Sequence, residues 1–283
     1  MNRHCHAWSD RPQIVDPLAD LHPRPNAAPS TYRERNSTAD RALDILLLFS
    51  ADKPVWTGAE IAAGLGVARS TGYRYLQSLS SNGFIEETPG GFRLGPRIFQ
   101  LARLARAGLG LSEAALPVMR ALAAQVDETV LLTRRSGRSV VCLDLVEAQQ
   151  TVRLSYERGQ VLPINAGAAA EVLLAWADPD EVTSVLEQAP LERFTAKTLT
   201  DPAALRARLS RIRKAGIAVS QGELDPHILG VAAPVRNAAG SVCAAVSVAA
   251  LAARVPRTQL REVESAVKDA AAAISRQLEL RDS

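Results

Sequence analysis

Cysteine and histidine are scarce in this sequence, and their scarcity excludes two kinds of site. Among 283 residues there are 3 cysteines, too few for the disulfide framework of a small secreted protein. Cys142 and Cys243 stand in strand-like runs, which favours buried, reduced thiols. Three of the 4 histidines fall before residue 37, so no His cluster with metal-ligand spacing occurs in the rest of the chain. We therefore predict no metal site and no cofactor.

Long apolar runs are also missing. The N-terminus lacks the apolar core of a signal peptide. The longest uncharged run, residues 237–253, is rich in Ala, Gly and Ser and is shorter than a membrane span. These features predict a cytoplasmic protein without a membrane partner.

One stretch lacks acidic side chains altogether. No Asp or Glu occurs between Glu60 and Glu86, although Arg69 and Arg74 lie in that window and the net charge of the whole chain is only +3. The apolar spacing of residues 67–79 predicts an amphipathic helix there. Its expected buried side consists of Gly72, Tyr75, Leu76 and Leu79.

The outward side of this helix has the chemistry of a nucleic-acid interface. Arginine can contact guanine with two hydrogen bonds, glutamine can do so with adenine, and hydroxyl groups bind bases or phosphates. Carboxylates would be repelled by the DNA backbone, and none is present. We predict that double-stranded DNA is bound by Arg69, Ser70, Thr71, Arg74 and Gln77. Tyr73 is equally able to pack against its neighbours, so it is not included in the predicted interface.

The flanking sequence places this helix in a winged helix-turn-helix. A capping box, Thr57 with Glu60, starts the preceding helix, and Gly66 suits the left-handed residue that ends it. Residues 84–94 read as strand, Pro-Gly-Gly turn and strand, which is a wing hairpin. We predict a disordered tail over residues 1–36 and a DNA-binding domain over residues 37–97.

The remaining chain mixes both periodicities. A leucine-rich linker helix is expected over residues 98–112, followed by a domain over residues 113–283. Strands are expected at 128–135, 139–146, 151–156, 216–221, 229–236 and 241–249. Helices are expected at 113–126, 168–176, 179–189, 201–215 and 257–281. The predicted fold class is α+β with two domains, the second an α/β domain rich in antiparallel strands.

Several blocks of the sequence resemble the IclR (isocitrate-lyase-regulator) family of bacterial transcription factors. They are "RALDILLLFS", "GAEIAAGLGVARSTGYRYLQSLSSNGFIE", "FRLGPRIFQLA", "LPINAGAAAEVLLA", "RKAGIAVSQGELD" and "GVAAPVRNAAGSVCAAVSVA". The resemblance implies a winged helix-turn-helix, a linker helix and a GAF-like domain that binds an effector. It further implies a homodimer or homotetramer acting on promoter DNA, and leaves repression and activation open.

The resemblance also implies that a small organic acid, aromatic acids included, binds in the second domain. The family's effector positions fall on Ala168, Ala169, Ser220, Gly230 and Ser247, with Ala249 beyond. Strand periodicity supports part of this, because Cys243, Ala245, Ser247 and Ala249 form one face of small residues, which leaves room either for a ligand or for tight backbone packing. A helix beginning near Gly167 would offer free amides to a carboxylate.

The chain departs from the family pattern at this expected site. Ala170 and Glu171 stand where the family commonly has Gly-Lys, and Ser220 and Gly230 stand where polar or thiol side chains are usual. Fewer polar anchors predict a more apolar or larger effector, or a pocket without a ligand. In the first turn of its helix, Glu171 is expected to complement the helix dipole.

Two other functions are weighed against a ligand-controlled regulator. An enzyme is disfavoured, because His227 is the only histidine outside the tail and neither inner cysteine has a recognisable base partner. The second alternative is a DNA-binding regulator whose second domain serves only oligomerisation.

Overall fold

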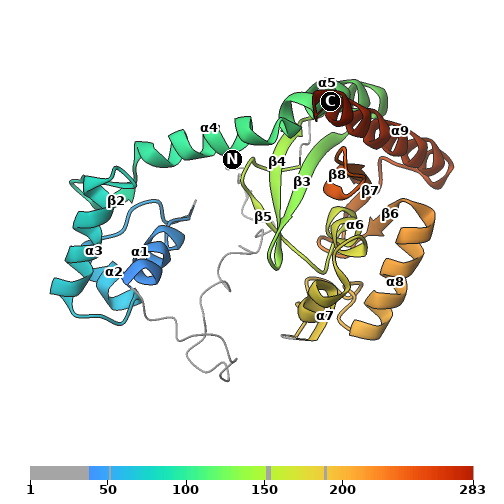
Figure 1. Cartoon of the computed structure of the whole chain (residues 1–283). Coiled ribbons are helices and arrows are strands. Elements are labelled where there is room, and N and C mark those ends of the chain that lie inside the picture. The colour runs from blue at the N-terminus through green and yellow to red at the C-terminus, as the bar shows by residue number, and fades with distance from the viewer. Residues whose placement is uncertain (1–37, 51, 151–153, 188–189, 283) are drawn as a thin grey trace, which may run out of the picture.

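The computed structural model describes residues 38–50, 52–150, 154–187 and 190–282. The tail predicted for residues 1–36 therefore lies outside the described residues. Within the described part, two bodies lie at opposite ends of the long helix α4, Pro96–Leu109 (Figure 1). None of the described helices has the length and apolar character needed to cross a lipid bilayer.

The first body is a three-helix unit with a hairpin. Its elements are α1 (Thr38–Leu47), α2 (Gly58–Gly64), α3 (Arg69–Ser81), β1 (Ile85–Thr88) and β2 (Gly91–Leu94). The predicted capping box of α2 is present, and Gly66 after it has the expected positive φ of 64°. The apolar core joins Ile45, Ile61, Leu76 and Ile85, each almost completely buried.

Glycine allows α2 and α3 to pack closely. A Cβ atom on Gly72 would lie 3.0 Å from the Cβ of Ala62, so a larger residue would push the two helices apart. This contact explains a glycine at a buried helical position, where it costs about 1 kcal/mol relative to alanine.

The hairpin is the wing predicted for residues 84–94. β1 and β2 pair antiparallel from Ile85 opposite Leu94 to Thr88 opposite Gly91. Trp56, just before α2, exchanges two backbone hydrogen bonds with Phe92. A Cβ on Gly91, whose φ is 132°, would lie 2.4 Å from the Trp56 carbonyl oxygen. The wing is therefore fixed to the segment that leads into the N-terminus of α2.

One helix, α4, connects the bodies. α4 is followed by α5, Leu111–Val126, and the residue between them, Gly110, has a left-handed φ of 57°. The last helix of the chain reaches back to this junction: Arg281 Nη1 donates to the Gly110 carbonyl oxygen at 3.0 Å and lies 3.0 Å from Glu113 Oε2.

The second body is built on one antiparallel sheet in the strand order β5-β4-β3-β8-β7-β6. The strands are β3 (Thr129–Ser136), β4 (Ser139–Val146), β5 (Val161–Pro163), β6 (Ala218–Gln221), β7 (Ile228–Arg236) and β8 (Val242–Leu251). The other helices are α6 (Ala168–Ala175), α7 (Pro179–Glu187), α8 (Pro202–Ala215) and α9 (Arg257–Asp282).

Helices cover both faces of this sheet. α5 and α9 pack on one face, over the side chains of Ala244, Val246 and Val248 in β8. α6 and α8 pack on the opposite face, where Ala245 and Ala232 contribute to a second core (Figure 1). The predicted alternation of β8 is thus present, and the two-body α+β fold class is confirmed.

Two local predictions were wrong. Residues 154–156, the described part of the strand expected over 151–156, form no strand, because Leu154 and Tyr156 pack their side chains on the small core of Leu131 and Cys142. The edge position is taken by β5, which was not expected. In β8 a register shift beside Cys243 turns this residue toward the α5 and α9 layer, away from the small-residue face predicted for it.

Candidate nucleic-acid interface and ligand pocket

The predicted DNA-facing residues share one side of α3. Arg69, Ser70, Arg74 and Gln77 are exposed and Thr71 is partly buried. On the opposite side Gly72, Leu76 and Leu79 are buried, and Tyr75 is partly buried. Within the described residues, none of Arg69, Arg74 and Gln77 uses its side chain in a hydrogen bond or ion pair. Their polar groups are therefore available to an external partner.

The two acidic residues that bound the acid-free stretch of sequence, Glu60 and Glu86, are each paired with a basic neighbour. Glu60 Oε1 lies 2.9 Å from Lys53 Nζ, and Glu60 also accepts hydrogen bonds from Thr57. The hydrogen bond from Lys53, and after it those from Thr57, lower the pKa of Glu60 to about 2. Glu86 pairs with Arg93 of the wing at 2.5 Å. Among the described residues, neither Arg69 nor Arg74 forms an ion pair with a carboxylate.

Tyr73 lies at the margin of the same surface, with 52% of its area exposed. Its ring is seated on Gly58, the first residue of α2: a Cβ atom built on Gly58 would lie 2.8 Å from the Tyr73 Cζ and Oη atoms. The packing that made this residue ambiguous in the sequence is therefore present, although about half of the residue remains exposed.

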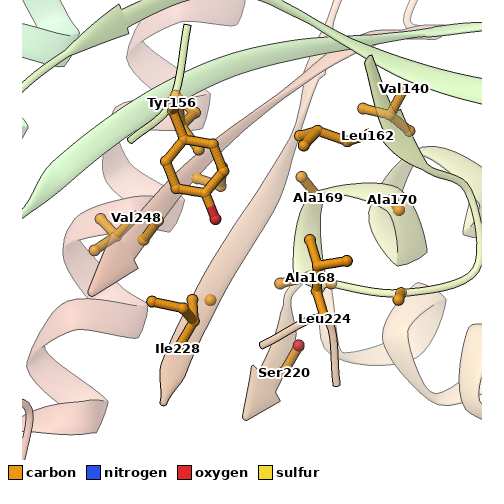
Figure 2. Close-up of a pocket in the computed structure, with 16 residues that line it drawn as sticks. Val140, Tyr156, Leu162, Ala168, Ala169, Ala170, Ser220, Leu224, Ile228 and Val248 are labelled. Atoms are coloured by element: carbon orange, nitrogen blue, oxygen red, sulfur yellow. The ribbon is translucent and has the colours of Figure 1, made fainter. Parts of the chain in front are cut away.

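A pocket of about 50 Å³ lies on the sheet face covered by α6. Residues from α6, β6, β7 and β8 meet there, with α6 contributing its first turn (Figure 2). The lining includes every effector position implied by the family resemblance, namely Ala168, Ala169, Ser220, Gly230, Ser247 and Ala249. These residues, up to 81 positions apart in sequence, are thus gathered around one cavity.

Glycine and serine give the pocket its shape and its polar groups. A Cβ on Gly230 would lie 3.4 Å from the Ala168 Cβ and 3.6 Å from the Ala168 backbone nitrogen, so the glycine lets the start of α6 lie against β7. Ser220 and Ser247 are 4% and 3% exposed, and neither hydroxyl has a hydrogen-bond partner among the described residues. The first amides of α6 likewise have no partner within their helix.

Several lining residues were missed by the sequence analysis. Tyr156 points its hydroxyl into the pocket beside Ile228, while Leu162 and Leu224 add apolar surface (Figure 2). Burial raises the pKa of Tyr156 to about 12, with the charges of Asp225 and Cys142 as smaller causes, so the phenol remains a hydrogen-bond donor. These residues come from loops and strand ends, where no periodic pattern signals a direction.

A buried charged cluster lies beside the pocket. Arg208 of α8 places Nε 2.8 Å from Glu171 Oε1 and Nη2 2.8 Å from Glu223 Oε1. The carboxyl of Glu171 is 1% exposed and neither of its oxygens has a well-formed hydrogen bond. Burial, followed by the Glu223 charge, raises the pKa of Glu171 to about 8. Glu171 stands in the first turn of α6, as expected, but it is buried against Arg208 and its raised pKa favours the neutral acid, so it does not act there as a charge on the helix dipole.

The described residues hold no group of three or more His, Cys, Asp and Glu side chains arranged to bind a metal ion. Cys142 is fully buried, and burial raises the pKa of its thiol to about 11, with the Asp144 charge adding to the effect. A thiol in this environment is protonated at neutral pH and is a poor nucleophile.

Comparisons with known proteins agree with the sequence blocks and with the fold. Residues 38–89 match the IclR helix-turn-helix domain, and residues 105–276 match the family described as bacterial transcriptional regulator IclR C-terminal. The HTH-type transcriptional regulator KipR of Bacillus subtilis is 31% identical over 247 residues, which cover 87% of this chain and 98% of KipR. The regulator BhcR of Paracoccus denitrificans is 35% identical over 238 residues, 83% of this chain and 85% of BhcR.

Solved structures extend the likeness to three dimensions. An IclR homolog from Microbacterium hydrocarbonoxydans, crystallised with 4-hydroxybenzoate, superimposes with a TM-score of 0.76 at 28% identity, covering 87% of this chain and 100% of that one. The IclR regulator from Alicyclobacillus acidocaldarius gives a TM-score of 0.74 at 28% identity, covering 84% of this chain and 97% of that one. The chain therefore belongs to the IclR family of bacterial transcriptional regulators.

Proposed function

We propose that this regulator binds promoter DNA through α3 and that a small organic acid, bound in the pocket beside α6, changes its affinity for that DNA. The observation that carries the first half is the exposed face of α3, which presents two arginines, hydroxyl groups and a glutamine amide without a carboxylate. A helix of this width fits the major groove, where such side chains distinguish base pairs. The action takes place in the cytoplasm, where bacterial DNA lies.

The lining of the pocket supports an acid as the effector. The amides at the start of α6 suit a carboxylate without a basic side chain, and the hydroxyls of Ser220 and Ser247 are free to orient it. The volume of about 50 Å³ suits a short aliphatic acid. An apolar cavity that holds benzene is about 150 Å³, so an aromatic acid requires lining side chains to move apart. The likeness to a protein crystallised with 4-hydroxybenzoate keeps aromatic acids among the candidates.

A homodimer is the expected working form. α4 exposes Phe99 and Leu104 at 77% and 60%, which is unfavourable for a lone helix in water. A second copy that covers these side chains would also place two α3 helices on the two halves of a palindromic operator.

One observation favours the alternative function, in which the second domain only assembles the protein. The pocket is small and no Lys, Arg or His lines it. Calorimetric titration with aromatic and short aliphatic acids distinguishes the two functions. A saturable heat of binding supports a sensor, and the absence of such a heat for every acid tested supports a domain that only assembles the protein. A turnover assay on any acid that binds then separates a sensor, which leaves its ligand unchanged, from an enzyme.

Arg74→Ala tests the DNA interface. If Arg74 contacts a base, its loss should weaken binding to the operator by about 1–3 kcal/mol. Fluorescence anisotropy on a duplex selected from a random-sequence pool measures the change. Arg211→Ala is the matched control, because it removes an equally exposed arginine from α8 and should leave affinity unchanged. Equal affinity of Arg74→Ala and the parent would remove Arg74 from the interface.

Ser247→Leu tests the pocket. A leucine side chain fills space that the effector needs, so the response of DNA binding to the acid should be abolished while the melting temperature stays close to that of the parent. Ser247→Ala is the matched control: it removes only the hydroxyl and should weaken the response without eliminating it. A Ser247→Leu protein that still responds normally would place the effector elsewhere.

A further inference from the structure

The seat of Tyr73 on Gly58 is a feature that packing of the helix-turn-helix does not require. The would-be Cβ of residue 58 lies 2.8 Å from Tyr73 Cζ and Oη and 3.2 Å from Cε2, so any residue larger than glycine would displace the ring. The ring nevertheless adds little to the core, since 52% of the tyrosine is exposed. Gly58 thus leaves room for an exposed aromatic side chain to stand against the start of α2.

Tyr73 stands in line with two of the residues predicted to face DNA. Arg69, Tyr73 and Gln77 are spaced four residues apart and form one row along α3. The phenol hydroxyl of Tyr73 has no hydrogen-bond partner within the described residues. The tip of the side chain rests on Gly58 while about half of the residue stays exposed, and a tyrosine whose hydroxyl lacks a partner in the described part of its own chain is well suited to an interface.

Gly58 also indicates which part of the DNA the hydroxyl meets. In a helix-turn-helix the second helix lies in the major groove, while the first crosses the sugar-phosphate backbone. Because the ring leans over the first residue of α2, its hydroxyl stands on the backbone side of α3. We propose that Tyr73 is a further DNA-contacting residue, and that Gly58 leaves its ring the room to stand where the hydroxyl donates a hydrogen bond to a backbone phosphate. This inference rests on the proposed binding of DNA through α3.

Tyr73→Phe is the direct test, read by anisotropy on the selected duplex and on a scrambled duplex of the same composition. Loss of one hydrogen bond to a charged phosphate should weaken both complexes by the same factor, about tenfold. The dependence of affinity on salt should keep its slope, because no cation is removed from the interface. Arg74→Ala, in contrast, removes a charge.

Gly58→Ala tests the role of the seat without touching the hydroxyl. The added methyl group must rotate the ring of Tyr73, the far end of a flexible side chain, so the fold should persist and DNA affinity should fall about as far as in Tyr73→Phe. In the double variant Gly58→Ala/Tyr73→Phe, DNA affinity should be no lower than in Tyr73→Phe alone. Tyr75→Phe is the matched control, since it removes a hydroxyl from the core side of the same helix and should leave affinity unchanged.

Each result decides the proposal. A parent protein that selects no duplex would overturn the proposed function itself, whereas a parent that binds while Tyr73→Phe binds equally well would overturn only the role of Tyr73. A loss confined to the selected duplex would mean that Tyr73 recognises a base and would overturn the assignment to phosphate. An additive loss in the double variant would overturn the role of Gly58.

Discussion

Glu171 brings a carboxyl group into the interior of the second body, between α6 and α8. Two carboxyl groups there share the single guanidinium of Arg208, so one of them holds its proton at neutral pH. This proton makes stability depend on pH, because the unfolded chain releases it at a much lower pH than the folded chain does.

We expect Glu171→Gln to change this dependence. The pKa of Glu171 is raised from 4.5 to about 8, so the free energy of unfolding of the parent should fall as pH rises through that interval, and the loss should level off above it. Glutamine carries no proton to release, so the fall should be much smaller in the variant. Thermal denaturation at a series of pH values measures it. Glu262→Gln, an exposed control on α9, should retain the slope of the parent, and an unchanged slope in Glu171→Gln would contradict the assignment.

At the scale of single residues, the sequence predicts which side of a helix a residue occupies better than it predicts which other residues its side chain contacts. Period counting placed Arg74 outside and Leu76 inside, because helical spacing alone determines the side on which a residue lies. It could not indicate that Glu171 meets Arg208, 37 positions later, or that Tyr156 enters the pocket. Such contacts depend on how the helices dock on the sheet.

Among the elements, α2 is short and depends on its cap. Seven residues are too few for a stable isolated helix. The Thr57 hydroxyl accepts a hydrogen bond from the Glu60 backbone N–H, and the Glu60 carboxylate accepts one from the Thr57 backbone N–H. α2 supports α3 through Ala62, so the cap contributes to the rigidity of the proposed DNA-binding surface.

Thr57→Ala should therefore destabilise the first body by about 1 kcal/mol. Urea denaturation followed by the fluorescence of Trp56, which lies next to the cap, reports this loss. Ser81→Ala removes an exposed hydroxyl that bonds only to Gln77 in its own helix, and it should have little effect. Identical unfolding midpoints for Thr57→Ala and the parent would contradict the energetic role of the cap.

Element prediction succeeded where the local pattern and the tertiary contacts agree. The expected strand 139–146 matches β4, a run of Val, Cys and Leu that is paired on both sides. The strand prediction fails at residues 154–156 because apolar side chains there cover a small core, while their backbone does not pair with a neighbouring strand. β5 has only three residues and ends at Pro163, too little for a periodic signal.

For the molecule as a whole, the exposed apolar side chains of α4 predict association. Replacing Phe99 and Leu104 together by serine should weaken self-association by about tenfold or more, because large apolar side chains at the centre of an interface carry much of its energy. Sedimentation velocity over a range of concentrations measures the shift. Leu280→Ser is the control, as Leu280 is 75% exposed on a different helix. A double variant that associates like the parent would exclude α4 from the interface.

The hydrogen bond from Arg281 to the Gly110 carbonyl oxygen brings the two ends of the second body, residues 111 and 281, close together. A segment whose two ends meet can be spliced into a surface loop of an unrelated host with little distortion of either partner. The second body of this regulator is consequently suited to insertion into a fluorescent reporter, where binding of the proposed effector would be read as an optical signal.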